Sequence, residues 1–281
     1  TARSLSVVSG RPMTIGFFGL SQAGKSYLIS SLAAGGNGRL ETRYGGETVG
    51  FLRHVNPPGG GKEATGLVTR FSRNASAGPE AYPVELQIFS EVDMVKILVN
   101  SYFNDFDKEQ VGYTFAPDRI KALIDSLKGR AGLADTGFSA DDAVSLWDYV
   151  RGSFGNSTRL LDSVYWPELM NLAPALRLED RAQLFSILWG EQAELSELYI
   201  GLANVLQALG HPSKVYAPLT ALIRREGDGF VQQDSIMNVD VLESLGSPAE
   251  KSLSVLPVRE HDGQTVVAAQ AVDVPLAHLA A

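Results

Sequence analysis

Cysteine is absent from this chain of 281 residues, which excludes a disulfide framework and any thiolate metal site and suits a reducing cytoplasm. No apolar run reaches the roughly 18 residues that a membrane-spanning helix needs, so we expect none. The chain also lacks a basic cluster: 24 Lys and Arg face 32 Asp and Glu, for a formal net charge of −8. Because nucleic-acid binding requires a concentrated basic surface, we expect no nucleic-acid partner.

Hydrophobic periodicity predicts a helical block between two β-prone stretches. Residues 91–225 place apolar side chains at i, i+3, i+4 and i+7, with Ser139 and Pro117 as expected helix starts. This helical block includes YAPLTALIRR, residues 216–225. The expected strands are 13–20 (MTIGFFGL), 67–73 paired with 82–89 as an antiparallel hairpin, 235–242, 252–258 and 265–272.

Residues 35–66 are rich in glycine, with ten glycines as well as Pro57 and Pro58. Loops longer than about fifteen residues are uncommon, and they are usually functional or disordered. We therefore expect a long loop here, which becomes ordered when a ligand is bound.

The segment GLSQAGKS directly follows the first expected strand and opens an expected helix. It matches the pattern G-x-x-x-x-G-K-[ST], whose glycines let successive backbone N–H groups point at phosphate oxygens. Lys25 can reach the β- and γ-phosphates, and the Ser26 hydroxyl can bind Mg²⁺. The alternative is a chance glycine-rich turn. The predicted phosphate-binding residues are Gly19, Ser21, Gln22, Ala23, Gly24, Lys25, Ser26 and Tyr27.

A second segment, EATGLVTRFS, follows the glycine-rich stretch. It resembles the first switch of dynamin-family large GTPases, a resemblance that implies a role for Thr69 in binding Mg²⁺ and holding the attacking water. Thr65 is the local rival, and an ordinary strand threonine is the simpler alternative. Dynamins have a catalytic glutamine at the position that Ser21 occupies here, one residue before Gln22. We therefore do not assign the catalytic role of that glutamine to Gln22.

The segments GFFGLSQAGKSYLISSLA, ETRYGG and ATGLVTRF together resemble the amino-terminal part of SrfC-type bacterial virulence factors. The resemblance covers mainly residues 13–75. It implies a P-loop GTPase-like domain at the front of a longer polypeptide, with protein partners encoded in the same operon. It also implies a bacterial protein, which we expect in the cytoplasm, with export as an effector the alternative.

A GTPase also needs an acidic residue at the end of a strand, in a D-x-x-G pattern, and no clean match stands in the expected place. Asp240 in SIMNVDVL is the first candidate, as an aspartate that contacts Mg²⁺ through water, and Asp93 is the second. Either could equally be a solvated loop aspartate. The base-reading motif N/T-K-x-D is absent, so GTP is implied by resemblance alone and ATP stays open.

We therefore expect an α/β P-loop NTPase fold, GTPase-like, whose sheet is interrupted by a mainly helical inserted domain. Residues 1–90 and 229–281 would form an incomplete nucleotide-binding domain, and residues 91–228 the helical insertion. The expected function is Mg²⁺-dependent binding and slow hydrolysis of GTP, with Lys25 and Thr69 as catalytic residues and Ser26, Thr69 and Asp240 around the metal. The alternative is a nucleotide-gated or inactive interaction module in a multiprotein virulence assembly.

Overall fold

The structure is a computed structural model that describes residues 5, 9, 13–19, 23–44, 46–57, 68–72, 81–106, 112–132, 137–232 and 269–275. The α-helices are α2 (Lys25–Leu32), α3 (Glu91–Asn104), α5 (Pro117–Lys128), α6 (Ala140–Thr158), α7 (Leu161–Val164), α8 (Trp166–Leu172), α9 (Leu178–Ser186) and α10 (Ala193–Ala208). The strands are β1 (Glu41–Tyr44), β2 (Glu47–Gly50), β3 (Val68–Ser72), β4 (Val84–Ile88), β5 (Lys214–Ala217), β6 (Ile223–Glu226), β7 (Gly229–Gln232) and β8 (Ala269–Pro275). A π-helix, η1 (Phe51–Val55), follows β2, and short 3₁₀ turns are η2 (Ala173–Ala175), η3 (Ile187–Trp189) and η4 (Leu219–Ala221).

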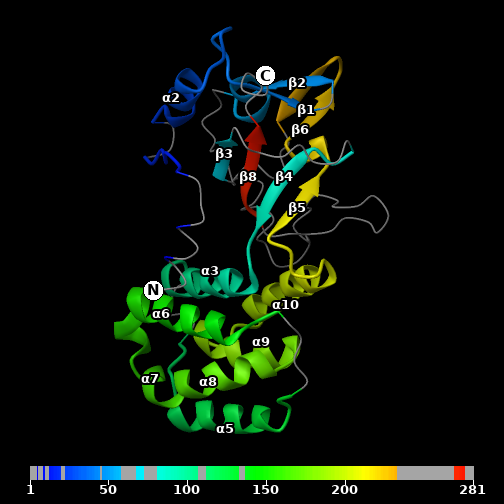
Figure 1. Ribbon diagram of the computed structural model, residues 1–281. Coiled ribbons are helices and arrows are strands. Elements are labelled where there is room, and N and C mark those ends of the chain that lie inside the picture. The colour runs from blue at the N-terminus through cyan, green and yellow to red at the C-terminus, as the bar shows by residue number, and fades with distance from the viewer. Residues whose placement is uncertain are drawn as a thin grey trace.

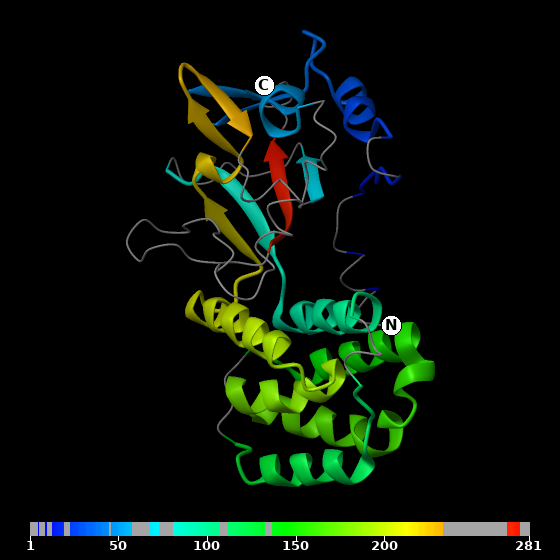
Figure 2. The ribbon, with the colours of Figure 1, turned by 180° about the vertical axis from the view of Figure 1, so that it is seen from behind.

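The strands gather in one part of the molecule, and the helices α3 to α10 gather in another (Figures 1 and 2). One four-stranded sheet has the order β3-β8-β4-β5, and two antiparallel hairpins, β1–β2 and β6–β7, lie beyond it. Helix α2 also lies at this β end, while α3 and α10 form the helical layer nearest the sheet.

The helical part is inserted between two neighbouring strands. Strands β4 and β5 pair antiparallel, from Val84 opposite Ala217 to Gln87 opposite Lys214. The Lys214 ammonium donates to the buried Glu85 carboxylate at 2.6 Å across this pair. The chain therefore leaves the sheet at the end of β4, forms α3 to α10, and returns beside its starting point.

Local capping explains where the insertion's helices begin. The hydroxyls of Ser90 and Ser139 accept from the backbone N–H three residues later, and Asp93 and Asp142 accept from the serine N–H groups in return. Each such capping box gives a hydrogen-bond acceptor to two backbone N–H groups that have no partner within the helix. Helix α5 begins with Pro117, where the missing N–H costs nothing. The predicted starts at Ser139 and Pro117 are confirmed.

Two hydrophobic cores meet at α3 and α10. Most buried side chains of α3, such as Val95 and Val99, pack in the helical core, while Met94 packs in the core of the β part. Helix α10 divides in the same way, with Tyr199 on one side and Leu206 on the other. These two helices thus fix how the insertion sits against the sheet.

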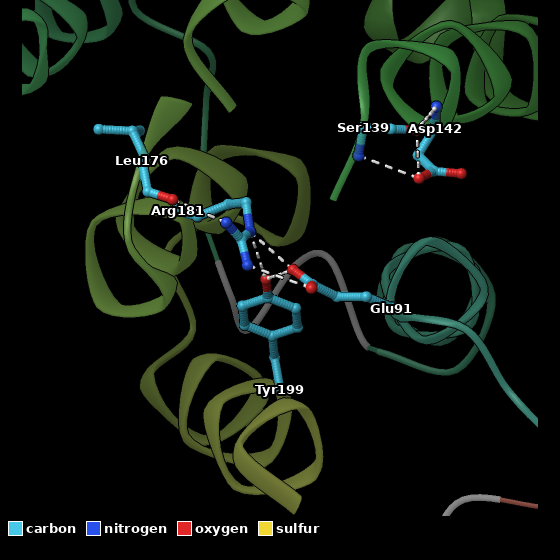
Figure 3. A network of polar contacts seen from close by, with 6 residues as sticks. All are labelled: Glu91, Ser139, Asp142, Leu176, Arg181 and Tyr199. Atoms are coloured by element: carbon cyan, nitrogen blue, oxygen red, sulfur yellow. Dashed lines mark hydrogen bonds and ion pairs between the residues drawn. The ribbon is translucent and has the colours of Figure 1, made fainter. Parts of the chain in front are cut away.

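A buried ion pair holds three elements of the insertion together (Figure 3). The Arg181 guanidinium donates to both oxygens of Glu91, at 2.6 and 3.1 Å, and each of these side chains is only 1% exposed. Arg181 also donates to the carbonyl of Leu176 at 2.8 Å, and the hydroxyl of Tyr199 donates to Glu91. Every charged atom of the pair therefore has a partner, which a buried ion pair requires.

Gly137 lies against this pair and against the chain that returns to β5. A Cβ at position 137 would stand 2.3 Å from Glu91 Oε2 and 2.6 Å from Cε1 of His211. The carboxylate cannot turn aside, because Arg181 holds both of its oxygens. Only glycine fits at this place.

Two expectations about the amino-terminal region are wrong. Residues 13–19 form no strand, and Met13, Ile15 and Phe18 are at least 80% exposed. A single strand without a pairing partner is not stable, and none of the strands in the described part of the chain pairs with this segment. The expected long loop instead contains β1, β2 and η1, whose buried side chains include Tyr44, Val49 and Val55.

Two expectations about strand pairing and helix extent are also wrong. Strands β3 and β4 are not a hairpin, because β8 lies between them, parallel to β3 and antiparallel to β4. Residues 216–225 are not helical but form the end of β5, the turn η4 and most of β6. The helical block therefore ends at Ala208, and one strand of the larger sheet, β5, falls inside the stretch expected to be helical. The strands expected at 235–242 and 252–258 lie outside the described residues.

No helix in the described ranges is long and apolar enough to cross a bilayer.

Replacing Gly137 by alanine should destabilise the fold by about 1–3 kcal/mol, the usual cost of forcing an extra carbon into a packed interior. Chemical denaturation followed by circular dichroism measures this. The matched control is Gly152→Ala in α6, where a Cβ meets nothing within 4 Å. That change should stabilise the protein by about 0.5–1 kcal/mol. Equal effects at the two positions would contradict the packing described here.

The buried tyrosines predict a loss of stability at alkaline pH. Burial, followed by the nearby Tyr113 for Tyr165 and Glu91 for Tyr199, raises the pKa of both well above the usual 10. Above about pH 10 an unfolded tyrosine releases its proton while these two retain theirs, so unfolding becomes more favourable as pH rises. Denaturation midpoints between pH 8 and 11 should fall above about pH 10, and a flat profile would contradict this.

Candidate functional site

The chain enters α2 through a glycine in a left-handed backbone conformation. Gly24 lies directly before the helix with φ of +81°, a left-handed conformation that costs other residues about 1–2 kcal/mol. No side chain caps the start of α2. A helix start carries a partial positive charge and N–H groups that have no partner within the helix, so it favours an anion. The predicted helix after GLSQAGKS is confirmed.

Lys25 folds back over this turn. Its ammonium donates to the carbonyl of Gly19 at 2.8 Å, and a Cβ added to Gly19 would lie 3.7 Å from the Cδ of Lys25. This bond joins the first glycine of the motif to its lysine. A phosphate oxygen placed at the loop would offer Lys25 a charged partner, which makes a stronger hydrogen bond than a neutral carbonyl.

The Ser26 hydroxyl has a specific partner, Asn56, thirty residues further along the chain. The Asn56 side-chain amide donates to Ser26 Oγ at 2.6 Å. A serine hydroxyl has one proton and two acceptor lone pairs, so this bond leaves one lone pair and the proton for another ligand. Ser26 can therefore bind a cation without giving up Asn56.

The π-helix η1 links α2 to strand β3. Phe51 packs edge-on against Phe71 of β3, with ring centroids 4.9 Å apart. His54 accepts from the N–H of Gly50 through Nδ1 and packs against Phe230 of β7. Burial, then the charge of Arg53, lowers the pKa of His54, so it stays neutral and able to accept this bond. Asn56 comes directly after this anchored turn.

Thr69 is the second residue of β3, two residues before Phe71. Its hydroxyl oxygen is enclosed and has no hydrogen-bond partner among the described residues. A buried hydroxyl without a partner costs about 1–3 kcal/mol. None of the described contacts joins Thr69 to Ser26.

The structure brings Gly19, Lys25, Ser26 and Asn56 together, and Ala23, Gly24 and Tyr27 lie on the same turn. Asp93, the second candidate for the acidic metal residue, instead caps α3, which lies at a different level of the molecule from α2 in both views (Figures 1 and 2). Ser21, Gln22, Thr65 and Asp240 lie outside the described residues. Sequence reasoning missed Asn56, because Asn-Pro indicates a turn and carries no sign of a contact with Ser26.

The described residues fit a magnesium–triphosphate group only in part. The left-handed turn, the uncapped helix start, Lys25 and the spare lone pair of Ser26 suit phosphate and a hard cation. The described part of the chain contains no group of three His, Cys, Asp or Glu side chains able to hold a metal by themselves. Magnesium usually takes only one or two protein ligands and the phosphates, so this does not conflict with such a site.

Comparison with known families assigns the whole chain. A family model described as "Putative bacterial virulence factor" matches residues 1–281. The chain belongs to this family. The resemblance noted from residues 13–75 is thereby confirmed at the level of the virulence-factor family, and it extends over all 281 residues. No match was found among curated proteins or among solved structures.

Replacing Gly24 by alanine should strain the α2 start without disturbing the rest of the fold. A Cβ there meets nothing within 4 Å, so only the backbone conformation is penalised, by about 1–2 kcal/mol. Hydrogen exchange should speed up in residues 25–32 and stay unchanged in α3 to α10. Gly36→Ala, which also meets nothing and has no positive φ, is the matched control. Faster exchange with the control alone would contradict this interpretation.

Proposed function

We propose that residues 19–27 bind the phosphates of a nucleoside triphosphate together with Mg²⁺, and that the chain is a nucleotide-dependent module of a bacterial virulence factor. GTP is the favoured nucleotide, by resemblance to the dynamin-family switch, and ATP is the alternative. Lys25 would neutralise phosphate charge, and Ser26 would bind the metal. Thr69 would complete the metal site and hold the water for slow hydrolysis.

The observation that carries the proposal is the turn from Gly24 into α2. The motif GLSQAGKS combines a left-handed glycine, an uncapped helix start and a lysine folded across the loop. A chance glycine-rich turn would explain the glycines but not why lysine, serine and a helix start converge on them. Phosphoryl transfer is catalysed mainly by positioning and charge, which are what these groups offer.

The contacts of η1 support a switching role. Asn56 follows η1 and touches Ser26, and Phe51 of η1 packs on Phe71 of β3, two residues from Thr69. A change at the metal would therefore reach β3 through packed side chains. Coupling of this kind needs two arrangements of the linking element, and in this proposal the irregular helix η1 is that element.

The second candidate function is an interaction module that binds nucleotide without useful turnover, or binds none. It is favoured by the exposed apolar side chains of Met13, Ile15 and Phe18 just before the loop, which offer an apolar surface to another protein. The capping role of Asp93 favours it too, because it removes one candidate for the acidic metal residue. Proteins encoded in the same operon are the proposed partners in both cases.

Two substitutions separate nucleotide binding from hydrolysis. Lys25→Ala should weaken triphosphate binding by about ten- to a hundredfold, because a charged hydrogen-bond donor is lost. Thr69→Ala should bind nearly normally but hydrolyse much more slowly, since the phosphate loop is intact. Titration with fluorescent GTP and ATP analogues measures binding, and phosphate release measures turnover.

The matched control is Lys121→Ala, which removes an exposed lysine from α5, within the helical insertion. It should leave binding and turnover unchanged. If the wild-type protein binds triphosphate without turnover and Thr69→Ala changes nothing, the interaction module replaces the GTPase. If the wild-type protein binds neither nucleotide, the loop is only a turn.

A further inference from the structure

Asn56 is held in place by a well-packed turn. It follows η1, whose Phe51, His54 and Val55 are all at most 9% exposed. Its own backbone N–H donates to the carbonyl of Phe51 at 2.8 Å. The side-chain amide is therefore presented to Ser26 by a packed and hydrogen-bonded segment, across thirty residues of sequence.

The direction of this hydrogen bond has a chemical consequence. Because the amide of Asn56 donates, Ser26 Oγ is the acceptor, and the serine rotamer is fixed by a group outside its own helix. One lone pair of Ser26 Oγ then stays available for a ligand and points in a fixed direction. Without Asn56, no described contact fixes the rotamer of Ser26, and its lone pairs would lose that direction.

We infer that Asn56 is a positioning residue that orients the Ser26 hydroxyl toward the cation of a bound magnesium–triphosphate. This inference rests on the proposed function of residues 19–27 and adds to it a residue that no motif contains. It predicts a specific defect: without Asn56, the phosphate loop still binds nucleotide, but Mg²⁺ contributes less to that binding.

The test compares nucleotide affinity with Mg²⁺ and with EDTA, using a fluorescent non-hydrolysable GTP analogue and the full chain. The dissociation constant in EDTA divided by the dissociation constant with Mg²⁺ gives the Mg²⁺ ratio, which measures how much Mg²⁺ strengthens nucleotide binding. Asn56→Ala should reduce this ratio about fivefold, the factor expected for one hydrogen bond of ordinary strength, with affinity in EDTA nearly unchanged. Ser26→Ala should lower the ratio at least as far.

Asn56→Asp provides a second variant of nearly the same shape. Its carboxylate would accept from the Ser26 hydroxyl, which frees both serine lone pairs and places a negative charge beside the cation. The Mg²⁺ ratio should therefore return to the wild-type value or exceed it, while affinity in EDTA falls through repulsion of the phosphates. A residue that merely braced η1 would give no such opposite effects.

Asn37→Ala is the matched control, because Asn37 is an exposed asparagine of the same part of the molecule that bonds Glu41. It should leave both affinities unchanged. A readout without nucleotide is the hydrogen exchange of residues 25–32, which Asn56→Ala should accelerate and Asn37→Ala should not.

Three results would overturn the inference. If Ser26→Ala lowers the Mg²⁺ ratio and Asn56→Ala does not, Asn56 has no positioning role, and the proposed function stands. If Asn56→Ala weakens binding equally with Mg²⁺ and with EDTA, its role is structural only. If the wild-type protein binds the analogue in neither condition, the proposed function and this inference fail together.

Discussion

The buried pair of Glu91 and Arg181 is the constraint on which the arrangement of the helical insertion depends. Glu91 stands at the first position of α3, immediately after the chain leaves β4, and Arg181 comes from α9. Burial alone would lower the pKa of Arg181, but Tyr199 and Glu91 outweigh it, and the pKa is raised. Arg181 therefore stays charged, and it needs the acceptors that surround it. Replacing either one alone would leave a buried charge unmatched, at a cost of about 3–5 kcal/mol.

The helical insertion is joined to the β part through two helices and two strands. Helices α3 and α10 contribute side chains to both cores, and β4 and β5 carry the chain between them. Helix α2 lies at the end of the β part that is farther from the insertion (Figures 1 and 2).

Local features could be predicted from the sequence, and long-range contacts could not. The starts at Ser139 and Pro117 and the helix after GLSQAGKS follow from residues within one turn of each start. The β1–β2 hairpin was not predicted from the sequence, because the glycines in and around residues 41–50 are typical of a loop. Strand β5 was missed because an apolar stretch such as VYAPLTALI suits a helix as well as a strand, and its pairing with β4 decides the outcome. The Asn56–Ser26 and Glu91–Arg181 contacts join residues thirty and ninety positions apart, which no local pattern signals.

A crystal structure with a non-hydrolysable GTP analogue and Mg²⁺ would show whether the turn before α2 is a phosphate site. We expect the β- and γ-phosphates to lie against the backbone N–H groups at the start of α2. Lys25 would exchange the carbonyl of Gly19 for a phosphate oxygen, and the metal would bind Ser26 Oγ, with Asn56 still donating to it. A nucleotide bound elsewhere, with Lys25 still on Gly19, would contradict this expectation.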